Sequence, residues 1–290
     1  MLNTLNDAST LRLVQIALAE DLGSGDVTAE SIFADRDYAA AEIIAKTGGV
    51  VCGLPIAALV FREISHEIDF YPLAGEGVAV TTGASLARVT GPAAGILAGE
   101  RTALNFLQRM SGVASLTRRY ADAVAGTGAT ILDTRKTIPA WRLLDKYAVK
   151  TGGGANHRFG LYDMAMIKDN HIAAAGGIAQ ALGKCREALE GTGIEIEIEA
   201  DSLDDVREAL RTGGFRRIMF DNFTPEETAE AVRLVGRHYE TESSGGITIG
   251  NIRQYAEAGV NFISVGALTH SAAALDISMD VRLNSAPRFD

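Results

Sequence analysis

The sequence predicts an α/β protein, and two patterns carry that prediction. From about residue 129 onward, short runs rich in β-branched residues alternate with segments of helical periodicity, which is typical of a parallel α/β sheet or barrel. In the first hundred residues, short strands are separated by glycines, with no regular crossover helices between them. We therefore expect a separate N-terminal α+β domain followed by a parallel α/β domain.

Each candidate strand of the second domain ends at a polar residue or a glycine. These strands cover 129–132, 164–167, 194–198, 217–220, 239–242 and 262–265, and a seventh is predicted over 154–159. Helices are expected over 139–150, 178–189, 203–211, 225–237 and 251–258. Ser202 and Thr224 occupy N-cap positions. The carboxyl ends of barrel strands form one face that holds the active site, so the residues that follow these strands are expected to converge.

The N-terminal part is predicted to contain strands over 41–45, 68–73 and 86–89. A long helical pattern over 94–124 then marks the boundary between the two domains. Because no flexible linker rich in proline or serine intervenes, the two parts are expected to pack rigidly.

The net charge of the 290-residue chain is −10, which argues against a nucleic-acid-binding protein. Net charge does not exclude an anionic small molecule, because a site can concentrate the opposite sign locally. Residues 133–171 contain seven lysines and arginines against four aspartates, a local surplus of +3 that leaves −13 for the rest of the chain. The cationic surplus therefore lies where several predicted strands end.

No segment reads as a membrane span or as a secretory leader. The longest uncharged run, 258–275, is too polar to cross a bilayer, and the N-terminus has no basic stretch followed by an apolar one. Cys52 and Cys185 lie far apart and have no metal-ligand spacing, so both are interpreted as small buried hydrophobic residues. A reducing cytoplasm is the expected compartment.

Among the cations, four lie at strand ends or beside glycines, namely Arg135, Lys136, Arg158 and Lys168. The arginine fork matches carboxylate and phosphate geometry, so Arg135 and Arg158 suit a ligand with several negative oxygens; salt bridges to nearby aspartates are the structural alternative. A second group, Arg142, Lys146 and Lys150, has i, i+4 helical spacing and is interpreted as a solvated helix face.

Two acids follow successive strands, Glu199 and Asp221. Their carboxylates are expected to lie near each other, where they would bind ribose hydroxyls, hold Mg²⁺ or stabilise a developing cation. The alternative, a helix N-cap, is disfavoured because Ser202 and Thr224 already fill that role.

Glycine loops follow the last two predicted strands. Ser244, Gly245 and Gly246 follow one strand, and Gly266 follows the next. In barrels, backbone N–H groups at this place commonly bind a phosphate. His157 stands beside Arg158, after the glycines 152–154. The motifs of P-loops, dinucleotide-binding folds, serine hydrolases and zinc proteases are absent from the sequence.

The chain resembles the quinolinate phosphoribosyltransferase family, also called nicotinate-nucleotide pyrophosphorylase (carboxylating), a type II phosphoribosyltransferase family. The resemblance runs through nearly the whole chain, in ERTALN at 100–105, LQRMSG at 107–112, DTRKT at 133–137, GGGANHR at 152–158, IKDNH at 167–171, DNF at 221–223 and SGGI at 244–247. One departure is IPAWR at 138–142, where the family more often has Thr-Pro-Gly-Leu-Arg.

This resemblance implies an N-terminal α/β sandwich domain over residues 1–107 and an open, seven-stranded α/β barrel over 108–276, with the tail 277–290 packing on the first domain. It also implies a head-to-tail homodimer or a larger homo-oligomer with shared active sites. The reaction implied is transfer of phosphoribosyl from 5-phosphoribosyl 1-diphosphate to quinolinate with Mg²⁺ as cofactor, which gives nicotinate mononucleotide, diphosphate and CO₂ on the route to NAD.

The resemblance assigns a role to each candidate residue. Arg135, His157, Arg158 and Arg101 of the partner subunit would clamp the carboxylates, and Lys136 and Lys168 would neutralise carboxylate or diphosphate charge. The two acids, Glu199 and Asp221, would face the ribose and Mg²⁺. The 5-phosphate would bind at Ser244, Gly245, Gly246 and Gly266. Of these, Lys136, Lys168, Glu199 and Asp221 are the expected catalytic residues.

Two other functions stay open at the level of the sequence. One is a phosphoribosyltransferase for nicotinate or another ring carboxylate that acts without decarboxylation. The other is a non-catalytic barrel that binds phosphorylated ligands. The combination of Arg101, Arg135, Lys136, His157 and Arg158 favours a dicarboxylate substrate over the first alternative, and the full set of charged strand-end and clamp residues disfavours the second.

Overall fold

The structure, a computed structural model, describes residues 7–34 and 37–283 and confirms the predicted α/β class. The chain forms two compact units. The first comprises Met1–Leu116, Ile138–Gly153 and Ala272–Asp290, and the second comprises Thr117–Thr137 and Gly154–Ser271. A 31-residue helix, α5 (Ala93–Ala123), runs from the first unit into the second and confirms the long helix predicted over 94–124.

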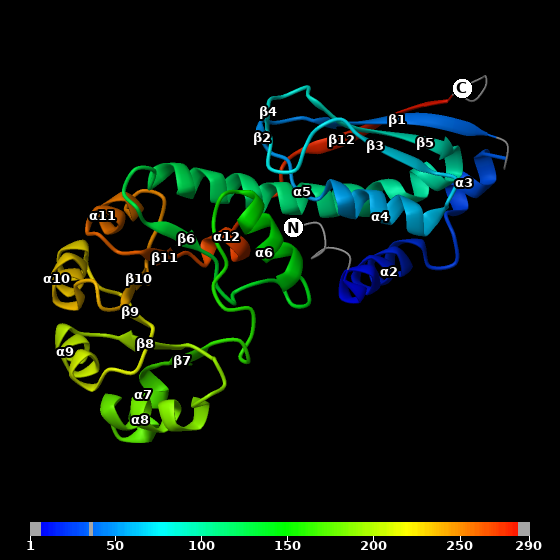
Figure 1. Cartoon of the computed structure of the whole chain (residues 1–290). Coiled ribbons are helices and arrows are strands. Elements are labelled where there is room, and N and C mark those ends of the chain that lie inside the picture. The colour runs from blue at the N-terminus through cyan, green and yellow to red at the C-terminus, as the bar shows by residue number, and fades with distance from the viewer. Residues whose placement is uncertain (1–6, 35–36, 284–290) are drawn as a thin grey trace. The chain divides into compact units, whose positions relative to one another are not determined.

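The first unit is built on an antiparallel sheet with strand order β12-β1-β5-β3. Its strands are β1 (Tyr38–Ala45), β3 (Asp69–Pro72), β5 (Ser85–Pro92) and β12 (Ile277–Leu283). Every second residue of β1 is buried, from Ala39 to Ala45, because one face of the sheet packs against helices. Figure 1 shows α4 (Leu54–Ile64) along that sheet, with α2 (Ala8–Leu22) beyond α4 and α3 (Val27–Ile32) near one end of the sheet.

The C-terminal strand belongs to this first unit, because β12 pairs with β1 from Ala45↔Ile277 to Ala39↔Leu283. Residues 284–290 of the expected tail lie outside the described residues. A small two-stranded sheet, β2 (Gly49–Val50) with β4 (Ala79–Val80), completes the strands of this unit that the structure describes.

The second unit contains a parallel sheet with strand order β6-β11-β10-β9-β8-β7. These strands are β6 (Thr130–Leu132), β7 (Ala165–Ile167), β8 (Ile196–Ala200), β9 (Arg217–Asp221), β10 (Glu240–Ser244) and β11 (Phe262–Ser264). The first strand in sequence therefore pairs with the last, as a barrel requires, while β7 stays at the other end of the order.

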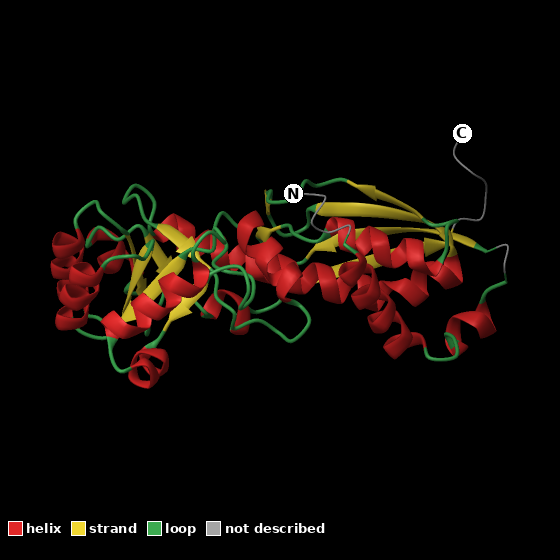
Figure 2. Ribbon diagram, turned by 60° about the horizontal axis from the view of Figure 1, so that its bottom comes forward, coloured by secondary structure: helices red, strands yellow, loops and turns green. Residues whose placement is uncertain are grey.

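Helices connect these parallel strands and surround them (Figure 2). They are α7 (Asp169–Ala175), α8 (Ile178–Leu189), α9 (Leu203–Thr212), α10 (Pro225–Val235), α11 (Ile252–Glu257) and the short α12 (Ala267–His270). Both predicted caps are confirmed, since Ser202 accepts from Asp205 N–H and Thr224 forms a capping box with Glu227.

The seventh strand predicted over 154–159 is wrong. Only one isolated parallel bridge, Leu132↔Ala155, extends the free edge of β6. After Ala155 the backbone N–H groups bond to side chains instead of a neighbouring strand: His157 N–H donates to Asp133, and Phe159 N–H donates to Asp163. Hydrogen bonds to the aspartate side chains therefore replace the backbone hydrogen bonds of a β-sheet, and the segment forms a loop at the open edge of the barrel.

The sequence prediction also fails at α6 (Arg142–Thr151), which starts three residues later than expected. Ala140 has a φ of 65°, in the left-handed region that a right-handed helix excludes. The interpretation of Arg142, Lys146 and Lys150 as a solvated face is wrong for Lys146, which is buried. Its neighbour Asp145 is also buried and forms an ion pair with Arg109 at 3.1 Å.

Across the described parts of the chain, no helix combines the length and apolar character needed to span a membrane.

Candidate active site

The carboxyl ends of the parallel strands bring most of the predicted residues together in the second unit. Asp221 at the end of β9 lies directly opposite Ser244 at the end of β10, in register. Lys168, which follows β7, forms an ion pair with Glu199 on the neighbouring β8. The strand-end prediction therefore describes a real juxtaposition of opposite charges at one edge of the sheet.

Arg135 and Arg158 lie close enough for their charges to interact. Burial, and then the like charge of Arg135, lowers the pKa of Arg158 from its ordinary value. The guanidinium of Arg158 donates to the carbonyl of Met164 at 3.1 Å, which spans the loop between the barrel edge and β7. Two arginines held close together form a region where an anion with several charges is favoured.

Lys136 is fixed through its backbone. Its N–H donates to the Thr134 hydroxyl at 3.0 Å, and its carbonyl accepts from the buried hydroxyl of Thr269 at 2.8 Å. A side chain at position 266 would lie 3.0 Å from the Lys136 stem, so Gly266 leaves room for that lysine. The Lys136 side chain therefore packs against Gly266, which follows β11.

Three carboxylates form an acidic group beside these cations. Glu199, Asp201 and Asp221 each offer an oxygen within 4.8 Å of the others. Burial, and then the charge of Asp201, raises the pKa of Asp221, whereas Lys168 and Lys136 act in the opposite direction. Carboxylate oxygens at such spacing suit a hard divalent cation that keeps part of its water shell, so the residues fit Mg²⁺.

The sequence prediction missed Asp201 in this group. It sits between Glu199 and the cap Ser202, and sequence reasoning assigned it to the start of the next helix. The cap hydrogen bond comes from Ser202 alone, which leaves the Asp201 carboxylate to face Glu199.

The loop after β10 has a backbone conformation that favours glycine at two positions. Gly245 and Gly246 have φ of 89° and 63°, which side chains rarely adopt. A Cβ at position 245 would lie 2.8 Å from the backbone nitrogen of Asn222, which itself donates to the Ser244 carbonyl at 2.9 Å. Glycine is therefore required at 245 by both conformation and space.

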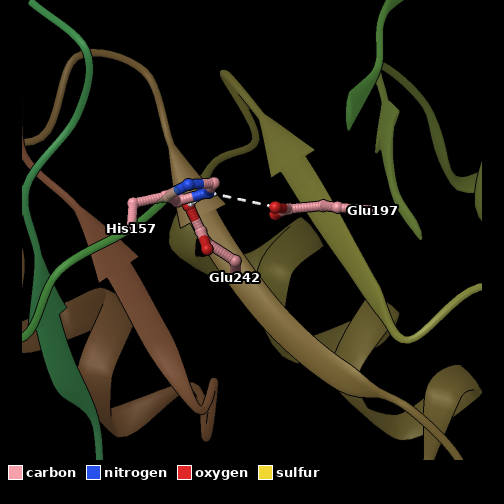
Figure 3. A group of neighbouring side chains, drawn as sticks. All are labelled: His157, Glu197 and Glu242. Atoms are coloured by element: carbon pink, nitrogen blue, oxygen red, sulfur yellow. Dashed lines mark ion pairs between the residues drawn. The ribbon is translucent and has the colours of Figure 1, made fainter. Parts of the chain in front are cut away.

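His157 points into the interior of the barrel (Figure 3). Its Nε2 atom lies 3.0 Å from an oxygen of Glu197 on β8 and 3.5 Å from one of Glu242 on β10. Its Nδ1 atom accepts from the N–H of Arg158 at 2.7 Å. The ring thus lies beneath the strand-end residues, with its Nε2 atom facing two buried carboxylates.

Arg217 on β9 joins the same interior group. It donates to Glu242 at 2.8 Å, and its guanidinium lies 4.0 Å from the ring centroid of Phe262. Burial raises the pKa of Glu197 to about 7, with Arg217 opposing; burial, and then the charge of Glu197, raises that of Glu242 to about 7.

Sequence reasoning did not find Glu197, Arg217 or Glu242. A signal was present for Glu197, because Glu197 and Glu199 are two residues apart on β8 and therefore lie on the same strand face. Glu242 likewise lies two residues before Ser244 on β10, on the strand face that carries a predicted site residue.

Arg101 differs from the other predicted residues in its location. It is exposed on α5 and belongs to the first unit, whereas the strand-end residues belong to the second.

Cations and carboxylates at the carboxyl ends of parallel strands, beside a glycine loop, define a class of α/β barrel proteins that bind phosphorylated ligands. Similarity to known protein families places the chain more closely within this class. The family described as "Quinolinate phosphoribosyl transferase, N-terminal domain" matches residues 26–111, and the corresponding C-terminal domain matches residues 113–280.

Individual relatives agree with the family match. The "Probable nicotinate-nucleotide pyrophosphorylase [carboxylating]" of Bacillus subtilis (strain 168) is 42% identical over 97% of this chain and 96% of its own. The crystal structure of NadC from Streptococcus pyogenes superposes with a TM-score of 0.91 at 36% identity, covering 94% of this chain and 96% of that one. The chain therefore belongs to the quinolinate phosphoribosyltransferase family.

The Gly245 geometry generates a first prediction. Gly245→Ala should raise the KM for a 5-phosphorylated substrate by about ten-fold or more, because a left-handed alanine would push against the Asn222 backbone and distort the loop. Steady-state kinetics measure the effect. Gly250→Ala is the matched control, since its Cβ would meet only the Thr248 hydroxyl, at 3.9 Å. Equal behaviour of the two variants would contradict the role given to the loop.

The buried glutamates generate a second prediction, on stability. Their folded-state pKa values near 7 exceed the ordinary carboxyl value, so the native state binds more protons than the unfolded chain between about pH 4.5 and pH 7. The free energy of unfolding contributed by these groups therefore falls as the pH rises through that window. Glu242→Gln should weaken this fall, as measured by urea unfolding at several pH values.

The exposed variant Glu187→Gln is the control for that series and should follow the wild-type curve. A Glu242→Gln curve as steep as the wild-type curve would show that the buried carboxylate does not titrate in this window.

Proposed function

We propose that this chain transfers the phosphoribosyl group of 5-phosphoribosyl 1-diphosphate to quinolinate with decarboxylation, giving nicotinate mononucleotide, diphosphate and CO₂. The observation that carries the proposal is the cationic group formed by Arg135, Lys136, Arg158 and Lys168 beside an acidic group at one edge of the sheet. A substrate with two carboxylates and a co-substrate with phosphate at both ends need this local cationic charge in a chain of net charge −10.

The dicarboxylate is expected at the arginines. Arg135 and Arg158 would bind the two carboxylates by bidentate hydrogen bonds, and Arg101 of the partner subunit would close the site in a homodimer or larger homo-oligomer. His157 lies behind Arg158, whose N–H donates to its Nδ1 atom, and would support this side of the site. Holding the pyridine nitrogen in line with the anomeric carbon supplies a large part of the rate, because positioning replaces an improbable encounter.

The phosphorylated co-substrate is expected at the glycine loops. The 5-phosphate would accept from the backbone N–H groups of 244–246 and of Gly266, which follow two neighbouring strands. Lys136 and Lys168 would neutralise the departing diphosphate. Lys168 also pairs with Glu199, so the lysine side chain is already held at this edge of the sheet.

Glu199 and Asp221 would hold Mg²⁺ together with Asp201, and their carboxylates fit such an ion. When bound, the ion would offset the negative charge of the diphosphate. The same two acids face the place where positive charge develops on the ribose, and they stabilise it electrostatically.

In the proposed reaction, the bond between C1 of the ribose and the diphosphate oxygen breaks, and the pyridine nitrogen forms a bond to C1. The ring nitrogen is then cationic, so the electron pair of the adjacent carbon–carboxylate bond can remain on the ring carbon as CO₂ leaves. A proton replaces the carboxylate on that carbon. No separate base is required for the decarboxylation.

The expected compartment is the cytoplasm, which suits a chain whose Cys52 and Cys185 are both free thiols.

The proposal predicts that the pure protein with quinolinate, 5-phosphoribosyl 1-diphosphate and Mg²⁺ releases diphosphate and CO₂ in equal amounts. A chelator should abolish turnover, and added Mg²⁺ should restore it. Lys168→Ala should lower kcat by about a hundred-fold, because a charge-assisted contact to the leaving group is lost. Diphosphate without CO₂ from nicotinate would indicate the sister activity, and no turnover with either acid would indicate a non-catalytic binding protein.

The shared site predicts complementation between two inactive chains. After subunit exchange, Arg101→Ala mixed with Lys168→Ala should regain about a quarter of the wild-type activity, because each hybrid dimer contains one intact site. Exchange is verified separately with two differently tagged chains. Absence of recovery after verified exchange would exclude a site completed by Arg101 of the partner subunit.

A further inference from the structure

The interior of the parallel sheet, one layer below the predicted site, is charged. Glu197 lies two residues before Glu199 on β8, and Glu242 lies two residues before Ser244 on β10, so each shares a strand face with a site residue. Both glutamates are fully buried. Barrel interiors of this kind are usually filled by branched apolar side chains, so a charged layer here is unusual and needs a physical explanation.

Stability does not supply the reason. A buried ionic group costs desolvation that its mutual attraction repays only in part, and apolar residues of similar volume often serve equally well. Here the layer contains two buried carboxylates, the Arg217 guanidinium over Phe262, and the hydroxyl of Ser264 that donates to Glu242. Such a network specifies one arrangement of its members more than it stabilises the fold.

The member whose orientation the network specifies is His157. Glu197 and Glu242 both face its Nε2 atom, at 3.0 and 3.5 Å. Its backbone N–H donates to Asp133 at 2.9 Å, and Asp133 also accepts from Asn156 at 2.6 Å. Figure 3 shows the ring facing the two carboxylates, which come from different strands. The residue is therefore held at its backbone and at one ring nitrogen.

The other ring nitrogen holds the next residue. The N–H of Arg158 donates to Nδ1 of His157 at 2.7 Å, so Nδ1 is an acceptor and the ring proton resides on Nε2, facing the carboxylates. The Arg158 guanidinium is tied at its far end to the Met164 carbonyl. Arg158 is thus fixed at both ends, and one end depends on the imidazole and the glutamates behind it.

We propose that Glu197 and Glu242 are positioning residues, which orient the His157 ring and through it place Arg158 for one carboxylate of an aromatic dicarboxylate substrate. This inference rests on the proposed function for the identity of the substrate. Neither glutamate touches the substrate; they act through His157, and His157 acts on the substrate through Arg158.

The test compares Glu197→Gln and Glu242→Gln with wild type. Each change keeps size and removes a carboxylate oxygen that faces Nε2. Both should raise the KM for quinolinate by about ten-fold or more while changing the KM for 5-phosphoribosyl 1-diphosphate less than about two-fold, because Arg158 serves only the dicarboxylate. Glu197→Asp keeps the charge and should recover part of the quinolinate affinity.

Glu240→Gln is the matched control. Glu240 lies on the same strand as Glu242 and pairs with the same arginine, Arg217, at 3.3 Å, but the structure records no contact between Glu240 and His157. Its KM for quinolinate should stay within about two-fold of wild type. Circular dichroism and the unfolding midpoint verify that every variant is folded.

A second measurement does not depend on turnover. In protein labelled with ¹⁵N-histidine, the His157 signals, assigned by their loss in His157→Gln, should report a protonated Nε2 and an unprotonated Nδ1 in wild type. The glutamine variants should shift that pattern, and Glu240→Gln should not.

Three results would overturn the inference. They are an unchanged quinolinate KM in folded Glu197→Gln and Glu242→Gln, an equal rise in KM for both substrates, and His157 signals that the two glutamine variants leave unchanged. If wild type fails to turn over quinolinate, the proposed function fails instead, and the histidine signals alone then decide whether the glutamates orient the ring.

Discussion

The second unit depends on one constraint, which is that parallel strands bring their carboxyl ends to the same edge of a sheet. Lys168, Glu199, Asp221 and Ser244 come from four strands that the chain visits over nearly eighty residues, yet they lie side by side because the strand order β10-β9-β8-β7 sets them there. Everything the site can do with charge follows from that convergence. A cation or an anion placed anywhere else in the chain would not be concentrated in this way.

The charges at this edge come in opposed groups. The lysines and arginines make one part of this edge positive, and the acids Glu199, Asp201 and Asp221 make another part negative. The cations affect the ionisation of the acids, since Lys136 and Lys168 oppose the rise in the pKa of Asp221 that burial and Asp201 cause. A ligand with phosphates, carboxylates and a sugar that becomes cationic during reaction needs both signs within one small space.

The charged residues in the barrel interior, beneath that edge, give a physical reason why a long side chain such as Arg158 holds one conformation. Arginine has many rotamers, and ordering it costs conformational entropy. The hydrogen bond from the Arg158 guanidinium to the Met164 carbonyl reduces that freedom before a ligand arrives, and the contacts from Arg217 through Glu242 and His157 hold the backbone that carries the side chain. Preorganisation of this kind is a reason for a barrel to hold a charged layer where an apolar one would fold as well.

The sequence alone determined the fold class, six parallel strands and the caps Ser202 and Thr224, because periodicity and capping are local properties of the chain. Its motifs also indicated the family, by resemblance. It also predicted the strand-end residues that face one another. Only the tertiary structure decided that 154–159 is a loop held by aspartates, that Lys146 is buried, and that Glu197 and Glu242 face His157 while Arg217 pairs with Glu242. Those facts depend on contacts between residues far apart in sequence, whose energies no local pattern records.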